Sequence, residues 1–174
     1  MKKILLVAAA AAGLVSIAPA FAADGTINIT GNVTTTACKV TTTTGINVVL
    51  PTVTTAALAS AGATAGNQPF AINLTLCPAN TTVSTYFEPG ANVDTATGNL
   101  KNTASGGAGN VQVALYNSDS TKINLNNVAG SQNSKSATIS GAGAMNYFAA
   151  YIANGAAATA GAVSTSVVFT MQYQ

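Results

Sequence analysis

The segment that decides the fold class is "VSTSVVFTMQYQ", at residues 163–174. Its side chains alternate between two faces, a period that predicts a half-buried β-strand. Most domains end in a few polar, poorly ordered residues, whereas here an aromatic side chain stands next to the last residue of the sequence. We therefore expect a strand that runs to the end of the sequence. In it, Val167, Phe169, Met171 and Tyr173 alternate with Val168, Thr170 and Gln172.

The rest of the sequence after residue 22 also has strand character. Gly, Pro and Asn separate short apolar or alternating segments, a pattern that favours one antiparallel β-sandwich domain. An Ala-rich stretch at 56–67 is expected to hold a short helical turn, and residues 111–125 are expected to form a hairpin. Strands are predicted at 26–36, 45–53, 69–78, 81–89, 111–120, 122–125, 136–140 and 144–155.

The first 22 residues have the pattern of a secretory signal peptide. Lys2 and Lys3 form a basic start, residues 4–18 are mostly apolar, and "AFA" at 20–22 is a small-x-small cleavage signal. The apolar run is shorter than the about 20 residues that a membrane span needs. We expect cleavage after Ala22 and a mature protein without a membrane span.

The mature chain is unusually poor in charge. Charged residues are 6% of the sequence, against about 25% in typical soluble domains. Without Lys2 and Lys3, four lysines balance four acidic residues, so the formal net charge is zero. Such a surface has no basic patch for nucleic acid and does little to oppose self-association.

The sequence also lacks the side chains of common active sites. It has no His, Trp or Arg, and its acidic residues are scattered singly. No base is available to activate a serine, and no pair of carboxylates is close in sequence. Two cysteines, Cys38 and Cys77, are expected to form a disulfide after secretion, and a metal site is disfavoured because no His completes a ligand set. We expect neither catalysis nor a cofactor.

The N-terminal segment admits two interpretations on local evidence. Residues 23–36 precede the first cysteine and alternate Ile27, Ile29 and Val33 with polar residues. Gly31 interrupts the apolar face, and a glycine inside a strand often marks a close approach of two backbones. The segment is either the first strand of the domain's own sheet or an extension that pairs elsewhere.

Several quoted segments together resemble the major fimbrial subunits of chaperone–usher pili, the type 1-like pilins. The extension "DGTINITGNVTTTAC" follows the signal peptide, and the second cysteine closes the strand "FAINLTLC". "VQVALYNSDS" resembles the family's mid-domain strand and turn. The last block, "YFAAYIANGAAATAGAVSTSVVFTMQYQ", is similar to the family's C-terminal block, with Gly161 fourteenth and Tyr173 second from the end.

This resemblance implies an all-β, incomplete immunoglobulin-like sandwich that lacks its seventh strand. A neighbouring subunit's N-terminal extension would complete it as a donor strand. The implied domains are a signal peptide at 1–22, a donor extension at 23–36 and a pilin domain at 37–174. The implied donor face is Ile27, Ile29, Gly31, Val33 and Thr35. The implied acceptor and chaperone-contacting strand carries Gly161, Val163, Thr165, Val167, Phe169, Met171 and Tyr173, and Cys38–Cys77 would tie the first two strands together.

The partners implied are further copies of this chain, a periplasmic pilus chaperone and an outer-membrane usher. The expected product is a linear homopolymer, a surface fimbrium exported through the periplasm and serving adhesion and biofilm formation. One alternative is a minor or adaptor subunit, or a receptor-binding adhesin module. Another is a secreted sandwich that is complete by itself and soluble as a monomer.

Overall fold

The computed structural model describes residues 28–30, 37–41 and 45–174. Residues 28–30 belong to an N-terminal unit, and the later ones belong to a second unit that starts at residue 33. In residues 28–30 no strand is formed, and the remainder of the strand predicted at 26–36 lies outside the described residues. In the described part of the second unit, the regular elements are one short 3-10 helix, η1 (Thr55–Leu58), and β-strands.

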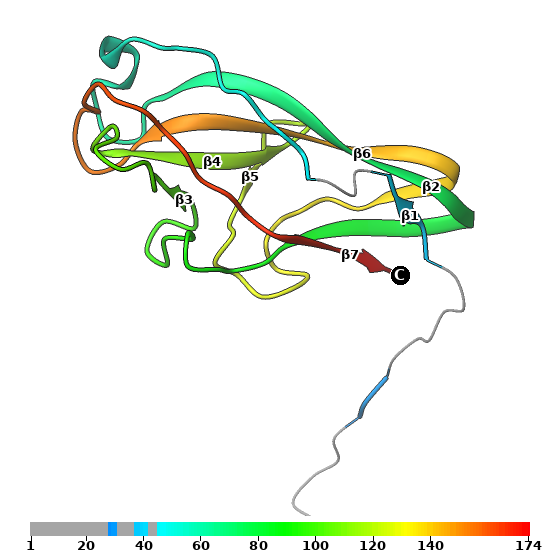
Figure 1. Cartoon of the computed structure of the whole chain (residues 1–174). Helices are drawn as coiled ribbons and strands as arrows, with labels where there is room; N and C mark the ends of the chain where they lie inside the picture. Colours follow the sequence, from blue (N-terminus) through cyan, green and yellow to red (C-terminus); the bar gives the residue numbers. More distant parts are fainter. Residues whose placement is uncertain (1–27, 31–36, 42–44) are drawn as a thin grey trace, which may run out of the picture. The chain divides into compact units, whose positions relative to one another are not determined.

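The strands of this unit belong to a single hydrogen-bonded sheet with antiparallel pairing throughout. Its order is β1-β2-β6-β4-β3, with β5 also paired to β4 and β7 also paired to β2 (Figure 1). The prediction of an antiparallel all-β domain is therefore confirmed. The strands are β1 (Lys39–Val40), β2 (Thr64–Phe87), β3 (Leu100–Lys101), β4 (Val111–Asn117), β5 (Lys122–Ile123), β6 (Ala137–Ala153) and β7 (Phe169–Tyr173).

β2 is the strand on which the sheet folds over. It is 24 residues long and joins the two strands predicted at 69–78 and 81–89. Its register against β6 shifts between Leu74 and Cys77 and again before Thr81, and Leu76 and Asn80 there have positive φ angles. Such irregularities bend a strand and let it pass from one layer to the other. β2 therefore pairs with β1 before the bend, at Leu74 and Thr75, and with β7 after it, from Val83 to Phe87.

The core lies between the folded halves of the sheet. Tyr147 of β6 is 2% exposed, and its ring contacts two others: Phe87 at 5.3 Å between centroids, edge-on, and Phe70 at 5.6 Å. Ile72, Leu115 and further aliphatic side chains of β2, β4 and β6 fill the space around it. The aromatic cluster anchors β2 to β6, the pair of strands that share the longest register.

Two predictions of regular strands, at 45–53 and at 163–174, are wrong in whole or in part. Residues 45–53 form no strand, and of the segment 163–174 only Phe169–Tyr173 is a paired strand. Both segments nevertheless keep the alternating burial that the sequence predicts. A strand is defined by a hydrogen-bonded neighbour, and no described segment pairs with these two along the edge where they face each other. The strands predicted at 136–140 and 144–155 also differ, because they are continuous within β6.

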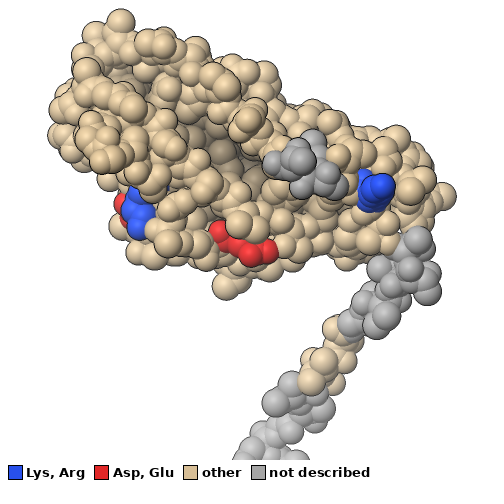
Figure 2. Space-filling view, viewed as in Figure 1, with Lys and Arg blue, Asp and Glu red and all other residues tan. Residues whose placement is uncertain are grey.

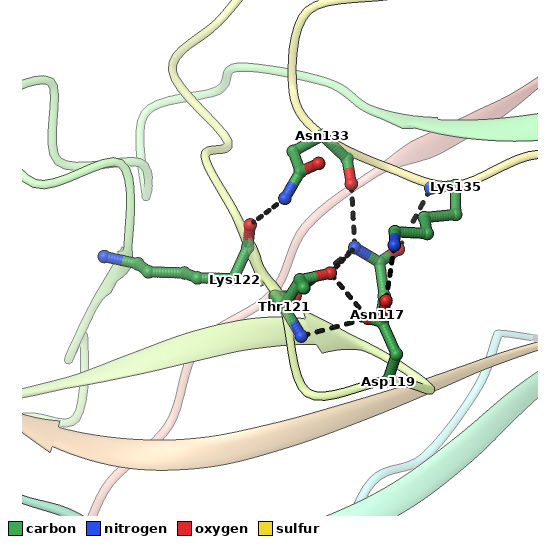
Figure 3. A network of polar contacts seen from close by, with 6 residues as sticks. All are labelled: Asn117, Asp119, Thr121, Lys122, Asn133 and Lys135. Atoms are coloured by element: carbon green, nitrogen blue, oxygen red, sulfur yellow. Dashed lines mark hydrogen bonds and ion pairs between the residues drawn. The ribbon is translucent and has the colours of Figure 1, made fainter.

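The β4–β5 hairpin is fixed by a polar network (Figure 3). The buried Asn117 side chain donates to Thr121 Oγ1 at 2.9 Å and to the Asn133 carbonyl at 2.7 Å, and it accepts from the Lys135 N–H at 3.0 Å. Asp119 accepts from Thr121 and forms an ion pair with Lys135. These contacts, the Lys135 ammonium first, hold the pKa of the Asp119 carboxyl well below its usual range.

The predicted disulfide between Cys38 and Cys77 is confirmed. Both half-cystines are buried, and the bond joins the chain just before β1 to the bend of β2. The Cys38 carbonyl also accepts a hydrogen bond from the Tyr173 hydroxyl at 3.1 Å. The disulfide therefore fixes one end of the domain, where the first and last strands meet.

Replacing Cys38 and Cys77 together by Ala is expected to lower the free energy of unfolding substantially. The bond closes a loop with a sequence separation of 39, for which chain entropy gives about 4 kcal/mol. The denaturant midpoint of the purified subunit measures the loss. Reduction of the unaltered protein should give a similar loss, and reductant should not change the double variant. An unaltered midpoint in the double variant would contradict this expectation.

Candidate functional site

An open groove runs between the two segments that lack strand partners. It has a volume of about 650 Å³ and lies between residues 45–50 on one side and residues 163–169 on the other. The space-filling view shows the same face, which is hollowed and carries few charged side chains (Figure 2). Its floor consists of core side chains from the sheet behind it: Phe70, Ile72, Phe87, Leu100, Val113, Leu115, Ala149 and Tyr151.

The first rim is the C-terminal segment, whose backbone alternates between two environments. Its even-numbered residues are hydrogen bonded on the side away from the groove: the carbonyls of Ala162, Ser164 and Ser166 accept bonds from the loop at 92–108. Among the described residues, the N–H and C=O groups of Val163, Thr165 and Val167 have no hydrogen-bond partner. In an extended chain the groups of alternate residues point to opposite sides, so these unpaired groups face the groove.

The same alternation continues into β7. Gln174 donates to the Thr82 carbonyl at 3.0 Å, and Glu88 donates to the Val168 carbonyl at 2.8 Å. The even-numbered residues of 168–174 therefore pair with β2, and the odd-numbered residues direct their backbone groups to the other side. The free backbone edge thus extends from Val163 to Tyr173 and belongs to the odd-numbered residues. The same residues carry the larger apolar side chains of this segment.

The second rim is the segment 45–50. Ile46, Val48 and Leu50 are half-buried and pack against the core, whereas Asn47 is exposed and Val49 is 79% exposed. None of the residues 45–50 has a backbone hydrogen bond to another described residue. The segment therefore has the side-chain alternation of a β-strand, but its backbone is not paired with another described segment.

The two rims run in opposite directions. Near one end of the domain, the Tyr173 hydroxyl bonds to the Cys38 carbonyl. Near the other end, the Ala158 N–H bonds to the Leu58 carbonyl at 3.0 Å. The chain therefore passes from 38 to 58 against the direction in which it later passes from 158 to 173. A strand lying in the groove would pair antiparallel with one rim and parallel with the other.

Some of the predicted acceptor residues line the groove, and others lie at the disulfide end of the domain. Val163, Thr165, Val167 and Phe169 line the groove. Tyr173 packs at the disulfide end, where its burial raises the pKa of the phenol and its hydroxyl bonds to Cys38. Six positions share the inward face, but Met171 and Tyr173 do not line the groove, which extends along only the first four.

Gly161 has a role that the sequence did not indicate. A Cβ at this position would lie 2.4 Å from the Ala108 nitrogen and 2.7 Å from the Gly107 carbonyl carbon. A Cβ at Gly107 would similarly lie 2.4 Å from the Ala162 carbonyl oxygen. Both glycines are required because two backbones touch here. Gly161 therefore fixes the start of the C-terminal rim against the 104–109 loop.

Of the predicted donor residues, the structure describes Ile29, which is 89% exposed. Ile27, Gly31, Val33 and Thr35 lie outside the described residues. Sequence reasoning missed the second rim as part of the site: it predicted a strand at 45–53 in which Pro51 suits an edge or a bulge, but it did not place that strand beside the groove. The available signal was Pro51, because proline is confined to strand edges and bulges and so indicates an edge. It also missed the asparagines of the 92–108 loop, for which the sequence carries no periodic signal.

The groove is suited to bind backbone and apolar side chains rather than to catalyse a reaction. None of its lining residues carries a charge. Within the described ranges, no group of three or more Cys, Asp or Glu side chains is arranged to hold a metal ion. Two unpaired backbone edges above an apolar floor present hydrogen-bonding groups and side-chain pockets to an extended segment. These features define an incomplete immunoglobulin-like domain with an open sheet edge.

Comparison with known proteins identifies the family. The family model described as type-1 fimbrial protein, A, matches residues 50–174. The chain is 47% identical to the major fimbrial subunit SMF-1 of Stenotrophomonas maltophilia, covering 87% of this chain and 94% of that one. It is 45% identical to the F17 fimbrial protein of Escherichia coli, covering 87% and 88%. The chain belongs to the type-1 fimbrial protein family.

A solved structure shares the fold. A chain from the structure of a chaperone–usher pilus superposes with a TM-score of 0.61 and 18% sequence identity, covering 90% of this chain and all of that one. The incomplete immunoglobulin-like sandwich inferred from the resemblance is therefore confirmed as the fold. The family is one of structural subunits rather than enzymes.

Proposed function

We propose that the protein is the structural subunit of an adhesive fimbrium and polymerises by donor-strand exchange. Each subunit would accept a strand in its groove and donate its own N-terminal extension, residues 23–36, to the next. The observation that carries this proposal is the free edge from Val163 to Tyr173 above an apolar floor. Strand addition to an exposed edge is an established recognition mode, used in chaperone–pilin complexes.

The composition supports an assembly in which many copies contact one another. The mature chain has a net charge of zero, so neighbouring copies do not repel strongly. An uncovered sheet edge is also a template for aggregation, so the groove needs an occupant from synthesis onward. A periplasmic chaperone would supply a temporary strand, and an outer-membrane usher would be the place where the next subunit's extension replaces it.

The domain boundaries follow from this function. Residues 1–22 would be removed as a signal peptide on export, residues 23–36 would be the donor extension, and residues 37–174 the pilin domain. The finished fimbrium would be extracellular and attached to the cell surface. No helix among the described residues is both long and apolar enough to cross a membrane.

The donor role is tested by replacing Gly31 by Leu. If Gly31 meets a tight part of the neighbour's groove, a bulky side chain overpacks the interface, an effect of about 1–3 kcal/mol. Fibre formation should fall at least roughly tenfold, whereas the amount of chaperone-bound subunit in the periplasm should not change. Sheared fimbriae and periplasmic extracts, compared by immunoblot, measure the two quantities.

Thr30→Leu is the matched control, because residue 30 lies on the opposite face of the extension. Its fibres should be close to normal in amount. Equal loss of chaperone binding and fibre formation in the Gly31→Leu variant would show that Gly31 acts within the fold of its own subunit, and the donor assignment would be wrong.

A further inference from the structure

We infer that Asn102 is a positioning residue for strand acceptance: its side-chain amide takes the place of a neighbouring strand on the outer side of the C-terminal rim. The inference rests on the proposed function, since it concerns how the same groove is kept ready for a strand. It arises from the contacts of Asn102, which is half-buried in the loop that follows β3.

The Asn102 amide makes four hydrogen bonds. Its Nδ2 donates to the carbonyls of Ala162 and Ala108, each at 2.9 Å. Its Oδ1 accepts from the N–H of Ser164 at 3.0 Å and from the N–H of Ala104 at 3.1 Å. One side chain therefore binds both the loop that carries it and the rim of the groove.

Two of these bonds reproduce a strand pairing. In a parallel pair, one residue donates to the carbonyl before its opposite number and accepts from the N–H after it, and the bonds are evenly spaced and slanted. Asn102 binds the Ala162 carbonyl and the Ser164 N–H in this way, on either side of Val163. With both even-numbered residues held outward, the N–H and C=O of Val163 must point into the groove.

Neighbouring contacts continue this support along the rim. The Thr103 N–H and Oγ1 donate to the Ser164 carbonyl at 2.8 and 2.9 Å. Asn92 Nδ2 donates to the Ser166 carbonyl at 3.0 Å. Elsewhere in the domain the Gln132 amide binds both backbone groups of Phe87 in a similar manner. Side-chain amides thus replace strands at two places where the sheet ends.

The consequence concerns the groove more than the stability of the domain. Without Asn102, the Ser164 N–H would lack its partner, and the peptide between Val163 and Ser164 would lose the bond that fixes its orientation. The Ala162 carbonyl would still be held by the Ala108 N–H, and the Ser164 carbonyl by Thr103. If this one peptide turns, the Val163 carbonyl no longer points toward the incoming strand. We expect a slower uptake of a donor strand from Asn102 variants whose folded core is intact.

The test uses the chaperone–subunit complex and a synthetic peptide of residues 23–36. The rate at which the peptide replaces the chaperone is measured for the unaltered subunit and for Asn102→Ala, together with the thermal midpoint of the peptide-filled product. Leaving polar groups unpaired at the rim should slow uptake roughly tenfold. Asn110→Ala is the control: it removes a side-chain amide that donates to the Ala157 carbonyl, outside the rim at 163–169, and its positive φ of 53° makes the variant lose stability without touching the rim.

Asn102→Asp provides a second variant: it keeps an acceptor for Ser164 but sets a carboxylate oxygen against the carbonyl oxygens of Ala162 and Ala108, so uptake should be slowed at least as much as in Asn102→Ala. It also keeps the inference testable if Asn102→Ala yields no complex. Uptake by both Asn102 variants at the rate of Asn110→Ala, or a slowing that merely follows the loss of thermal midpoint, would overturn the inference. Failure of the unaltered subunit to take up the peptide would instead contradict the proposed function.

Discussion

Fibres are expected to disappear from the cell surface when residues 23–35 are deleted, while the subunit still accumulates with its chaperone. The deletion removes the implied donor strand and leaves the groove, whose lining residues lie at 45–50 and beyond, unchanged. Such a subunit accepts a strand but cannot fill the groove of the next one, so each chain ends after one addition. Electron microscopy of the cells and immunoblots of periplasmic extracts measure the two outcomes.

The control keeps the length and composition of the extension but moves its apolar residues to the other face. Exchanging Ile27 with Asn28, Ile29 with Thr30, and Val33 with Thr34 does this, since a shift by one residue turns every side chain of a strand to the opposite face. This variant should fail as completely as the deletion. Normal fibres from either variant would show that another segment completes the groove, and the donor assignment would have to be abandoned.

Replacing Val48 by Asp is expected to prevent strand acceptance almost completely. Val48 is half-buried on the groove rim at 45–50. In the open groove a carboxylate there still reaches water, but an inserted strand would cover it. An uncompensated buried charge costs about 3–5 kcal/mol, which corresponds to a loss of affinity of more than roughly a hundredfold. Both chaperone-bound subunit and fibres should become scarce, as measured by co-purification and by shearing.

Val49→Asp is the matched control for this change. Val49 is the next residue along the same rim and is 79% exposed, so the same charge remains in water after a strand is inserted. Fibre yield from Val49→Asp should be near normal. If Val48→Asp assembled as well as Val49→Asp, residues 45–50 would not form a wall of the strand-binding groove.

The fold was largely predictable because its signals are local. Alternation of apolar and polar side chains predicted strands, Gly and Pro marked their ends, and two cysteines in a secreted chain predicted the disulfide. The errors have one physical cause: strand boundaries depend on pairing between residues far apart in sequence. β2 continues through Pro78, where the sequence suggested two strands, because β6 pairs with it on both sides of the bend.

The candidate site was predictable only in part. The alternation from Val167 to Tyr173 was visible in the sequence, whereas the face from Val163 onward and its role followed from resemblance to pilins. The opposite rim at 45–50 and the amide of Asn102 were not predictable, since nothing in a single sequence states which segments face each other across a groove. Gly161 was recognised by its place in the sequence. Only the structure shows why a glycine is needed there: the backbone of Gly107 and Ala108 leaves no room for a Cβ.

By itself, the sequence determined that residues 163–174 would alternate and bury one face, because side-chain order is a property of the chain. The tertiary structure decided which side of that segment would be left without hydrogen bonds. Backbone pairing is a contact between distant segments: β2 and the 92–108 loop occupy the even-numbered groups, and no described segment occupies the odd-numbered ones. The open edge on which the proposed function depends is therefore a product of folding.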